Sequence, residues 1–226
     1  MIVPAMNEKE IESEIKKDLT RIHKSTIPRL AVEYHRERRK LKIDKLSDYN
    51  KIYSIKTAGK NQWMIFIKKA TGNPKYKQAC DATFFSVVYY YTKQGLNVCR
   101  VYGLDGELEF FYGHFFSRYN ERQQLNLPNT LFAVKHFFNN NESFRSILSH
   151  TKKERAQPET MFIESVCKEG LALGIYYIGT RHTVYKTFIS QHLLTKQQRS
   201  VEEILDEEIN ENVIVDPYTG LESVAA

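Results

Sequence analysis

Long apolar runs and cysteine are both scarce in this chain of 226 residues. None of its apolar stretches approaches the roughly 20 residues that a membrane-crossing helix requires, so no membrane association is expected. The first ten residues, Met1-Ile-Val-Pro-Ala-Met-Asn-Glu-Lys-Glu, lack a basic region followed by an apolar stretch, so no secretory signal is expected. Cys80, Cys99 and Cys167 are odd in number and widely spaced, without the spacing of a zinc site. They are typical of reduced core cysteines and favour a cytoplasmic protein.

Several common chemical motifs are also missing. There is no Gly-x-x-x-x-Gly-Lys phosphate loop and no Gly-x-Gly-x-x-Gly dinucleotide fingerprint. The seven histidines are scattered, and none has a histidine or acidic partner at metal-ligand spacing. Neither Ser190 nor any cysteine lies in a nucleophile-elbow context. The sequence therefore predicts no cofactor and no metal site.

Positive charge is unevenly distributed along the chain. Residues 201–226 carry eight acidic side chains and no Lys or Arg, which leaves residues 1–200 with 33 basic and 19 acidic side chains, a formal charge of +14. A charge this high on residues 1–200, the basic body of the chain, favours a polyanionic partner, and RNA or another nucleic acid is the first candidate. Alternatively, the Lys-rich helices only provide a soluble surface. The acidic end lies next in sequence to this basic body. It is therefore a possible intramolecular competitor for the same surface, or simply a solvated end.

Helical periodicity predicts several helices around a set of strands. Ile11, Ile15, Leu19 and Ile22 form one stripe of an amphipathic helix over 7–22 that Asn7 opens. Further helices are predicted from Pro28 to Leu41, from His114 to about Leu125, after Pro128 with Asn129 as cap, over 142–150, and from about Leu193 to Ile209.

Period-two patterns and turn residues predict the strands. Residues 51–57 and 62–68 flank Ala-Gly-Lys-Asn as a hairpin, and strands over 83–92, 96–102 and 107–112 continue it into an antiparallel meander. Three more strands are predicted over 161–166, 171–178 and 183–190. The fold class is α+β: a mainly antiparallel sheet with two N-terminal helices, inserted central helices and a C-terminal helix. We divide the chain into a helical segment 1–50, an antiparallel domain 51–200 and an acidic helix end and tail 201–226.

The decapeptide 113–122, Gly-His-Phe-Phe-Ser-Arg-Tyr-Asn-Glu-Arg, is the most informative segment for function. On a helix, His114, Arg118 and Arg122 share one face, because residues four apart differ by only about 40°. Phe115, Phe116 and Tyr119 fall on the opposite side, which is predicted to be buried. One imidazole beside two guanidinium groups suits phosphodiester chemistry, with a proton shuttle and two fixed donors for phosphate oxygens. Alternatively, Glu121 pairs with the arginines on a solvated helix face.

Residues 104–190 resemble small ribonuclease domains of the RelE, barnase and colicin type. The resemblance consists of the His-x-x-x-Arg-x-x-x-Arg helix, a second helix, and then several strands, the last of which reads Val184-Tyr-Lys-Thr-Phe. It covers about two-fifths of the chain. Phe115 stands where that family usually has a small residue, and the five strands that precede the motif are an addition to the family pattern.

The resemblance implies metal-independent RNA cleavage, in which the 2′-hydroxyl attacks its own phosphate. Such a reaction needs a base, an acid and cationic stabilisation. The resemblance implies that His114 is the proton shuttle, that Arg118 and Arg122 clamp the phosphate, and that Thr187 supplies a hydroxyl. Lys186 is an alternative to Thr187, because neighbouring strand residues point to opposite faces.

Two further residues near the last strand are candidate substrate contacts. His182 is a candidate acid in the turn with Arg181, although an ordinary exposed turn histidine would have the same sequence pattern. The alternative function is a non-catalytic nucleic-acid-binding or protein-interaction module that uses the same basic face. The oligomeric state is not predicted.

Overall fold

The computed structural model describes residues 1–41, 50–69, 82–102, 107–141, 144–149, 159–195, 198, 213–215 and 222–224. The fold is α+β, and the chain forms two compact units, Met1–Gly113 and His114–Ala226. The sequence-based division placed its boundaries at residues 50 and 200 instead. The difference near residue 50 arises because the two N-terminal helices belong to the same compact unit as the first five strands. Among the described residues, no helix has the length and apolar character needed to cross a membrane.

The first unit begins with α1 (Glu8–Arg21), and its start is as predicted. The Asn7 side chain accepts a hydrogen bond from the Glu10 backbone amide at 3.1 Å, and the Glu10 carboxylate accepts one from the Asn7 amide at 2.8 Å. This reciprocal pair satisfies two amides that the helix itself leaves without partners. A π-helical turn, Ile22–Thr26, joins α1 to α2 (Ile27–Arg38).

Asp18 on α1 fixes this helix to the first hairpin of the sheet. Its carboxylate accepts hydrogen bonds from the Thr57 hydroxyl at 2.7 Å, the Asn61 amide at 2.7 Å and the Trp63 indole at 3.2 Å. Ile11, Ile15 and Leu19 are buried along the same helix. The polar anchor and the apolar stripe thus act together to hold α1 within the unit.

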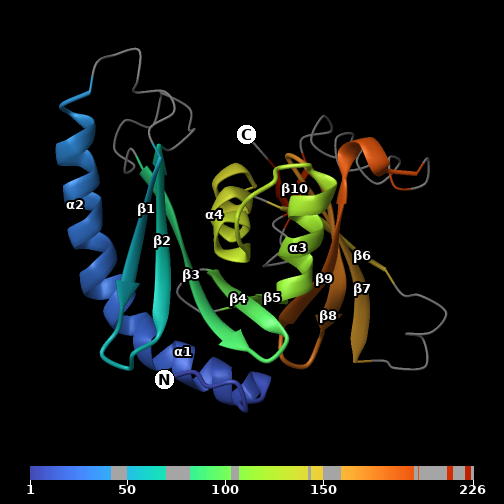
Figure 1. The fold of residues 1–226 in the computed structure, drawn as a ribbon, viewed down its shortest axis with the longest axis horizontal. Coiled ribbons are helices and arrows are strands. Elements are labelled where there is room, and N and C mark those ends of the chain that lie inside the picture. Colours follow the sequence, from blue (N-terminus) through green and yellow to red (C-terminus); the bar gives the residue numbers. More distant parts are fainter. Residues whose placement is uncertain are drawn as a thin grey trace. The chain divides into compact units, whose positions relative to one another are not determined.

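The sheet of this unit is the predicted meander. Its strands are β1 (Lys51–Lys56), β2 (Gln62–Lys69), β3 (Ala82–Thr92), β4 (Gly95–Tyr102) and β5 (Glu107–Phe111). Each strand pairs antiparallel with the next one in sequence (Figure 1). Residues 70–81, which connect β2 to β3 and include Cys80, lie outside the described residues.

The second unit begins with two helices that share an aromatic core. These are α3 (Gly113–Arg122) and α4 (Thr130–Asn140), and α4 has Asn129 as its N-cap, as predicted. Phe115 and Tyr119 of α3 meet Phe137 of α4 edge-on, with ring centroids 5.2 and 5.0 Å apart. Such edge-to-face pairs add to the stabilisation from burial alone.

Four antiparallel strands complete this unit's core: β6 (Arg145–Ser149), β7 (Thr160–Cys167), β8 (Gly170–Tyr177) and β9 (His182–Ser190). They pair in the order β9-β8-β7-β6. A short hairpin of β10 (Val213–Val215) and β11 (Glu222–Val224) follows. Most of the helix predicted over 193–209 lies outside the described residues, and the described part before it forms a 3₁₀ turn, Gln191–Leu193.

The helix predicted over 142–150 is wrong, because residues 145–149 form strand β6. Phe144, Ile147 and Leu148 fit a helical spacing, but a short apolar run does not distinguish a helix from a strand. Hydrogen bonding to a neighbouring strand favours the strand here, because β6 pairs antiparallel with β7 and Ile147 lies opposite Glu164. The Ser146 hydroxyl also lies 2.7 Å from the Ser165 hydroxyl on β7.

A β-bulge interrupts β9 at Lys186. Leu173 of β8 pairs with Thr187, but the next residue, Gly174, pairs with Tyr185, which leaves Lys186 as the extra residue. A Cβ atom at position 174 would collide with the Val184 carbonyl oxygen, so only glycine permits this close approach. Strict alternation of Lys186 and Thr187 between the two faces of the strand therefore does not hold.

Candidate functional site

Helix α3 has the two faces that its sequence predicts. Phe115, Phe116 and Tyr119 are fully buried. His114 and Arg118 are exposed, and Arg122 is half-buried. The buried ring face packs on α4 and β9, and this packing fixes which way the polar face points.

The two arginines of α3 reach strand β9. Nη1 of Arg118 donates a hydrogen bond to the Thr187 hydroxyl at 3.2 Å, and Nη1 of Arg122 donates one to the Phe188 carbonyl. Two residues that the sequence placed in one site, Arg118 and Thr187, are therefore in direct contact. We call the surface formed by His114, Arg118, Arg122, Lys186 and Thr187 the α3–β9 face.

Both guanidinium groups are held by neutral acceptors. Among the described residues, neither Arg118 nor Arg122 forms an ion pair with a carboxylate, so the alternative pairing with Glu121 is not observed. A guanidinium carries five N–H donors, and the hydrogen bonds to Thr187 and Phe188 orient each group without neutralising its charge. The α3–β9 face thus presents fixed positive charge.

The other three predicted site residues do not contact Arg118 or Arg122 through any hydrogen bond between described residues. Lys186 is exposed at the bulge, one residue from Thr187. Arg181 is exposed in the turn before β9, with a positive φ of 53°. His182 is buried, with 4% of its surface exposed, and starts the strand about 17 Å from Thr187 at the usual strand rise. Arg181 and His182 therefore lie away from Arg118, because the four strand residues 183–186 separate His182 from Thr187, and Arg181 is one residue further away.

A polar network around Glu169 supports the inner side of α3. The Glu169 carboxylate accepts hydrogen bonds from the Tyr119 hydroxyl at 2.5 Å, the Asn140 amide at 3.1 Å and the Asn141 amide at 2.6 Å. The Tyr119 hydroxyl also lies 2.7 Å from Nδ1 of His136. Burial, reinforced by the Glu169 carboxylate, raises the pKa of Tyr119, so the tyrosine stays a donor to Glu169 at neutral pH. This network was not predicted from the sequence.

A depression of ≈ 600 Å³ adjoins the C-terminal end of α3. Gln123, Glu169, Ser190 and His192 are among its lining residues. The Ser190 hydroxyl lies 2.9 Å from Nδ1 of His192, which is exposed. The Glu169 carboxylate is turned towards Tyr119 and the two asparagines, so Ser190, His192 and Glu169 do not form a catalytic triad. The close sequence spacing of Ser190 and His192 was the only signal that could have identified this contact.

No group of three or more His, Cys, Asp and Glu side chains in the described part of the chain is arranged to hold a metal ion. Comparison of the chain with known protein families, with curated proteins and with solved structures finds no match.

Proposed function

We propose that the α3–β9 face binds the phosphodiester backbone of RNA. The proposal depends on one observation. Hydrogen bonds to two uncharged groups, the Thr187 hydroxyl and the Phe188 carbonyl, orient Arg118 and Arg122. Preoriented guanidinium groups suit phosphate oxygens because they donate two parallel hydrogen bonds. The charge of +14 on residues 1–200 supports the same partner through long-range attraction.

Arg118→Ala is expected to weaken RNA binding about tenfold at low salt, as loss of one charge-assisted hydrogen bond predicts. Fluorescence anisotropy with a labelled single-stranded RNA measures the change. Arg181→Gln is the matched control, because Arg181 is an exposed arginine of the same unit that lies away from Arg118. Equal losses from both variants would show that general charge, and not this face, governs affinity.

Metal-independent RNA cleavage is the second candidate function. The contact between Arg118 and Thr187 favours this function, because two of the four predicted catalytic residues meet there. Arg118 also lies one helical turn from His114, a third predicted catalytic residue. His114 would transfer the proton, and the arginines would stabilise charge on the phosphorane. The buried position of His182 argues against its role as the second proton donor. His114 is therefore the residue on which this candidate depends.

If the protein cleaves RNA, His114→Ala is expected to lower the rate by at least about 100-fold, the usual contribution of a general acid or base. RNA affinity is expected to stay nearly unchanged, because the arginines remain. Cleavage of a labelled RNA is measured with and without EDTA, and His35→Ala in α2 is the control. Unchanged cleavage by His114→Ala removes this histidine from the mechanism, and loss of cleavage in EDTA contradicts the metal-independent reaction.

A further inference from the structure

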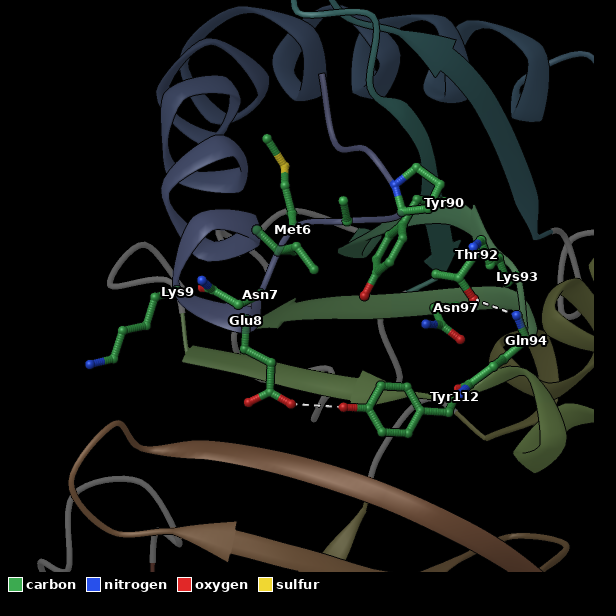
Figure 2. Close-up of a pocket in the computed structure, with 13 residues that line it drawn as sticks. Met6, Asn7, Glu8, Lys9, Tyr90, Thr92, Lys93, Gln94, Asn97 and Tyr112 are labelled. Atoms are coloured by element: carbon green, nitrogen blue, oxygen red, sulfur yellow. Dashed lines mark hydrogen bonds between the residues drawn. The ribbon is translucent and has the colours of Figure 1, made fainter.

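A cavity of ≈ 970 Å³ opens beside the start of α1 in the unit Met1–Gly113. One wall is the N-terminal segment with Pro4, Ala5, Met6 and the first residues of α1, and the other comes from β3, β4 and Tyr112 (Figure 2). Its volume falls within the roughly 300–1,000 Å³ of small-molecule sites. The residues that line this cavity belong to the unit Met1–Gly113 and differ from those of the α3–β9 face.

Apolar and aromatic groups make up much of the lining. Met6 and Ile11 contribute aliphatic surface, and Tyr90 and Tyr112 contribute aromatic rings (Figure 2). The face of an aromatic ring carries partial negative charge and attracts cations. This lining therefore suits a ligand with both an apolar body and a positive charge.

Glu8 places a carboxylate at the cavity. Its Oε1 accepts a hydrogen bond from the Tyr112 hydroxyl at 2.7 Å, and no described residue donates to its Oε2. Figure 2 shows the Glu8 carboxylate and the hydroxyl groups of Tyr90 and Tyr112 around the same space, whereas Lys9 extends away from it. The cavity thus contains a charged acceptor, one oxygen of which receives no hydrogen bond from the part of the chain that the structure describes.

Tyr90 of β3 and Asn97 of β4 lie opposite each other in the sheet, and both line the cavity. The Asn97 side chain accepts a hydrogen bond from the Gly113 backbone amide at 3.1 Å. Tyr90 is 8% exposed, and burial raises its pKa, an effect to which the negative charge of Glu8 adds. The Glu8 carboxylate is the negatively charged group of the lining, and such a group attracts a cation and repels an anion.

We infer that this cavity binds an organic cation, namely a protonated primary amine on an aliphatic chain. The three N–H donors of an ammonium group have the Glu8 carboxylate and the Tyr90 oxygen as acceptors. The carbon chain contacts Met6 and Ile11, and the tyrosine rings stabilise the charge. Two sources supply this chemistry: a free diamine or polyamine, and the lysine side chain of a partner protein.

Isothermal titration calorimetry of the full chain tests the inference with 1,5-diaminopentane, Nα-acetyl-lysine amide and 1-pentanol. Saturable binding of the amines and none of the alcohol is expected. Tighter binding of the diamine indicates a free amine as ligand, and tighter binding of the lysine derivative indicates a partner protein. Absence of saturable binding for both amines, or equal binding of pentanol, overturns the inference.

Three variants locate the binding. Glu8→Gln keeps an acceptor for Tyr112 but removes the charge, and is expected to weaken amine binding at least about tenfold. The control Glu159→Gln removes one exposed carboxylate from the other unit and should leave affinity unchanged. Lys93→Ala removes a cation from the cavity rim and is expected to strengthen amine binding about twofold. Equal effects of the two glutamate variants, or weaker binding by Lys93→Ala, contradict a cation site.

Discussion

Replacing Glu169 with alanine is expected to lower the free energy of unfolding of the unit His114–Ala226 by about 3 kcal/mol. The carboxylate accepts three hydrogen bonds, from Tyr119, Asn140 and Asn141, within 3.1 Å. Its removal leaves these donors without their acceptor, and each such loss costs about 1–3 kcal/mol where water cannot replace it. The losses are not additive, because the donors belong to one network.

Hydrogen exchange of the amides in α4 measures the effect of Glu169→Ala. Exchange that requires opening of this unit is expected to accelerate roughly 100-fold, since about 1.4 kcal/mol corresponds to a factor of ten. Glu121→Ala, which removes an exposed carboxylate of α3, should change the exchange little. Trp63, the single tryptophan, reports on the other unit by its fluorescence. Unchanged α4 exchange in Glu169→Ala would show that the network does not stabilise the fold.

RNA affinity is expected to fall about 15-fold when the salt concentration rises from about 50 to 200 mM. Three phosphate contacts, made by Arg118, Arg122 and Lys186, predict a log–log slope of about −2 for a single-stranded ligand, because each contact releases condensed counterions. More contacts from the rest of the basic body would make the slope steeper. A binding mode dominated by base stacking would make it flatter.

Anisotropy titrations at several salt concentrations give this slope. An RNA with an uncharged methylphosphonate backbone is the control, and its affinity should be low at every salt concentration. A slope near zero for the natural RNA, or no binding at about 50 mM salt, would contradict recognition of the phosphodiester backbone.

Local signals account for the parts of the fold that the sequence predicted well. Asn7 and Asn129 were recognisable as caps because each precedes an amphipathic run, and both side chains accept an amide at the start of a helix. Three of the four strand pairs of the β1–β5 meander were predictable because few residues separate the paired strands in the sequence; β2 and β3 are separated by residues 70–81. The two faces of α3 followed from helical periodicity alone.

The features that the sequence did not predict depend on contacts between distant residues. Strand β6 forms because β7 offers it hydrogen bonds, which no local pattern encodes. The position of Lys186 depends on a bulge opposite Gly174, one strand away. Glu169 meets Tyr119 across 50 residues of sequence, and it was one acidic residue among many in the chain. For the α3–β9 face, helical spacing identified the residues of α3, but the contacts of the arginines with β9 and the burial of His182 required the structure.

Crosslinking of the full chain to a 4-thiouridine-containing RNA, followed by mass-spectrometric mapping of the crosslinked peptides, tests the central proposal most directly. The basic segment 35–40 is the competing surface, because it carries four Lys and Arg residues in six. Crosslinks concentrated in residues 113–122 and 182–190, and lost in Arg118→Ala, are the predicted result. Crosslinks concentrated in residues 35–40 and unchanged by Arg118→Ala would contradict RNA binding at the α3–β9 face.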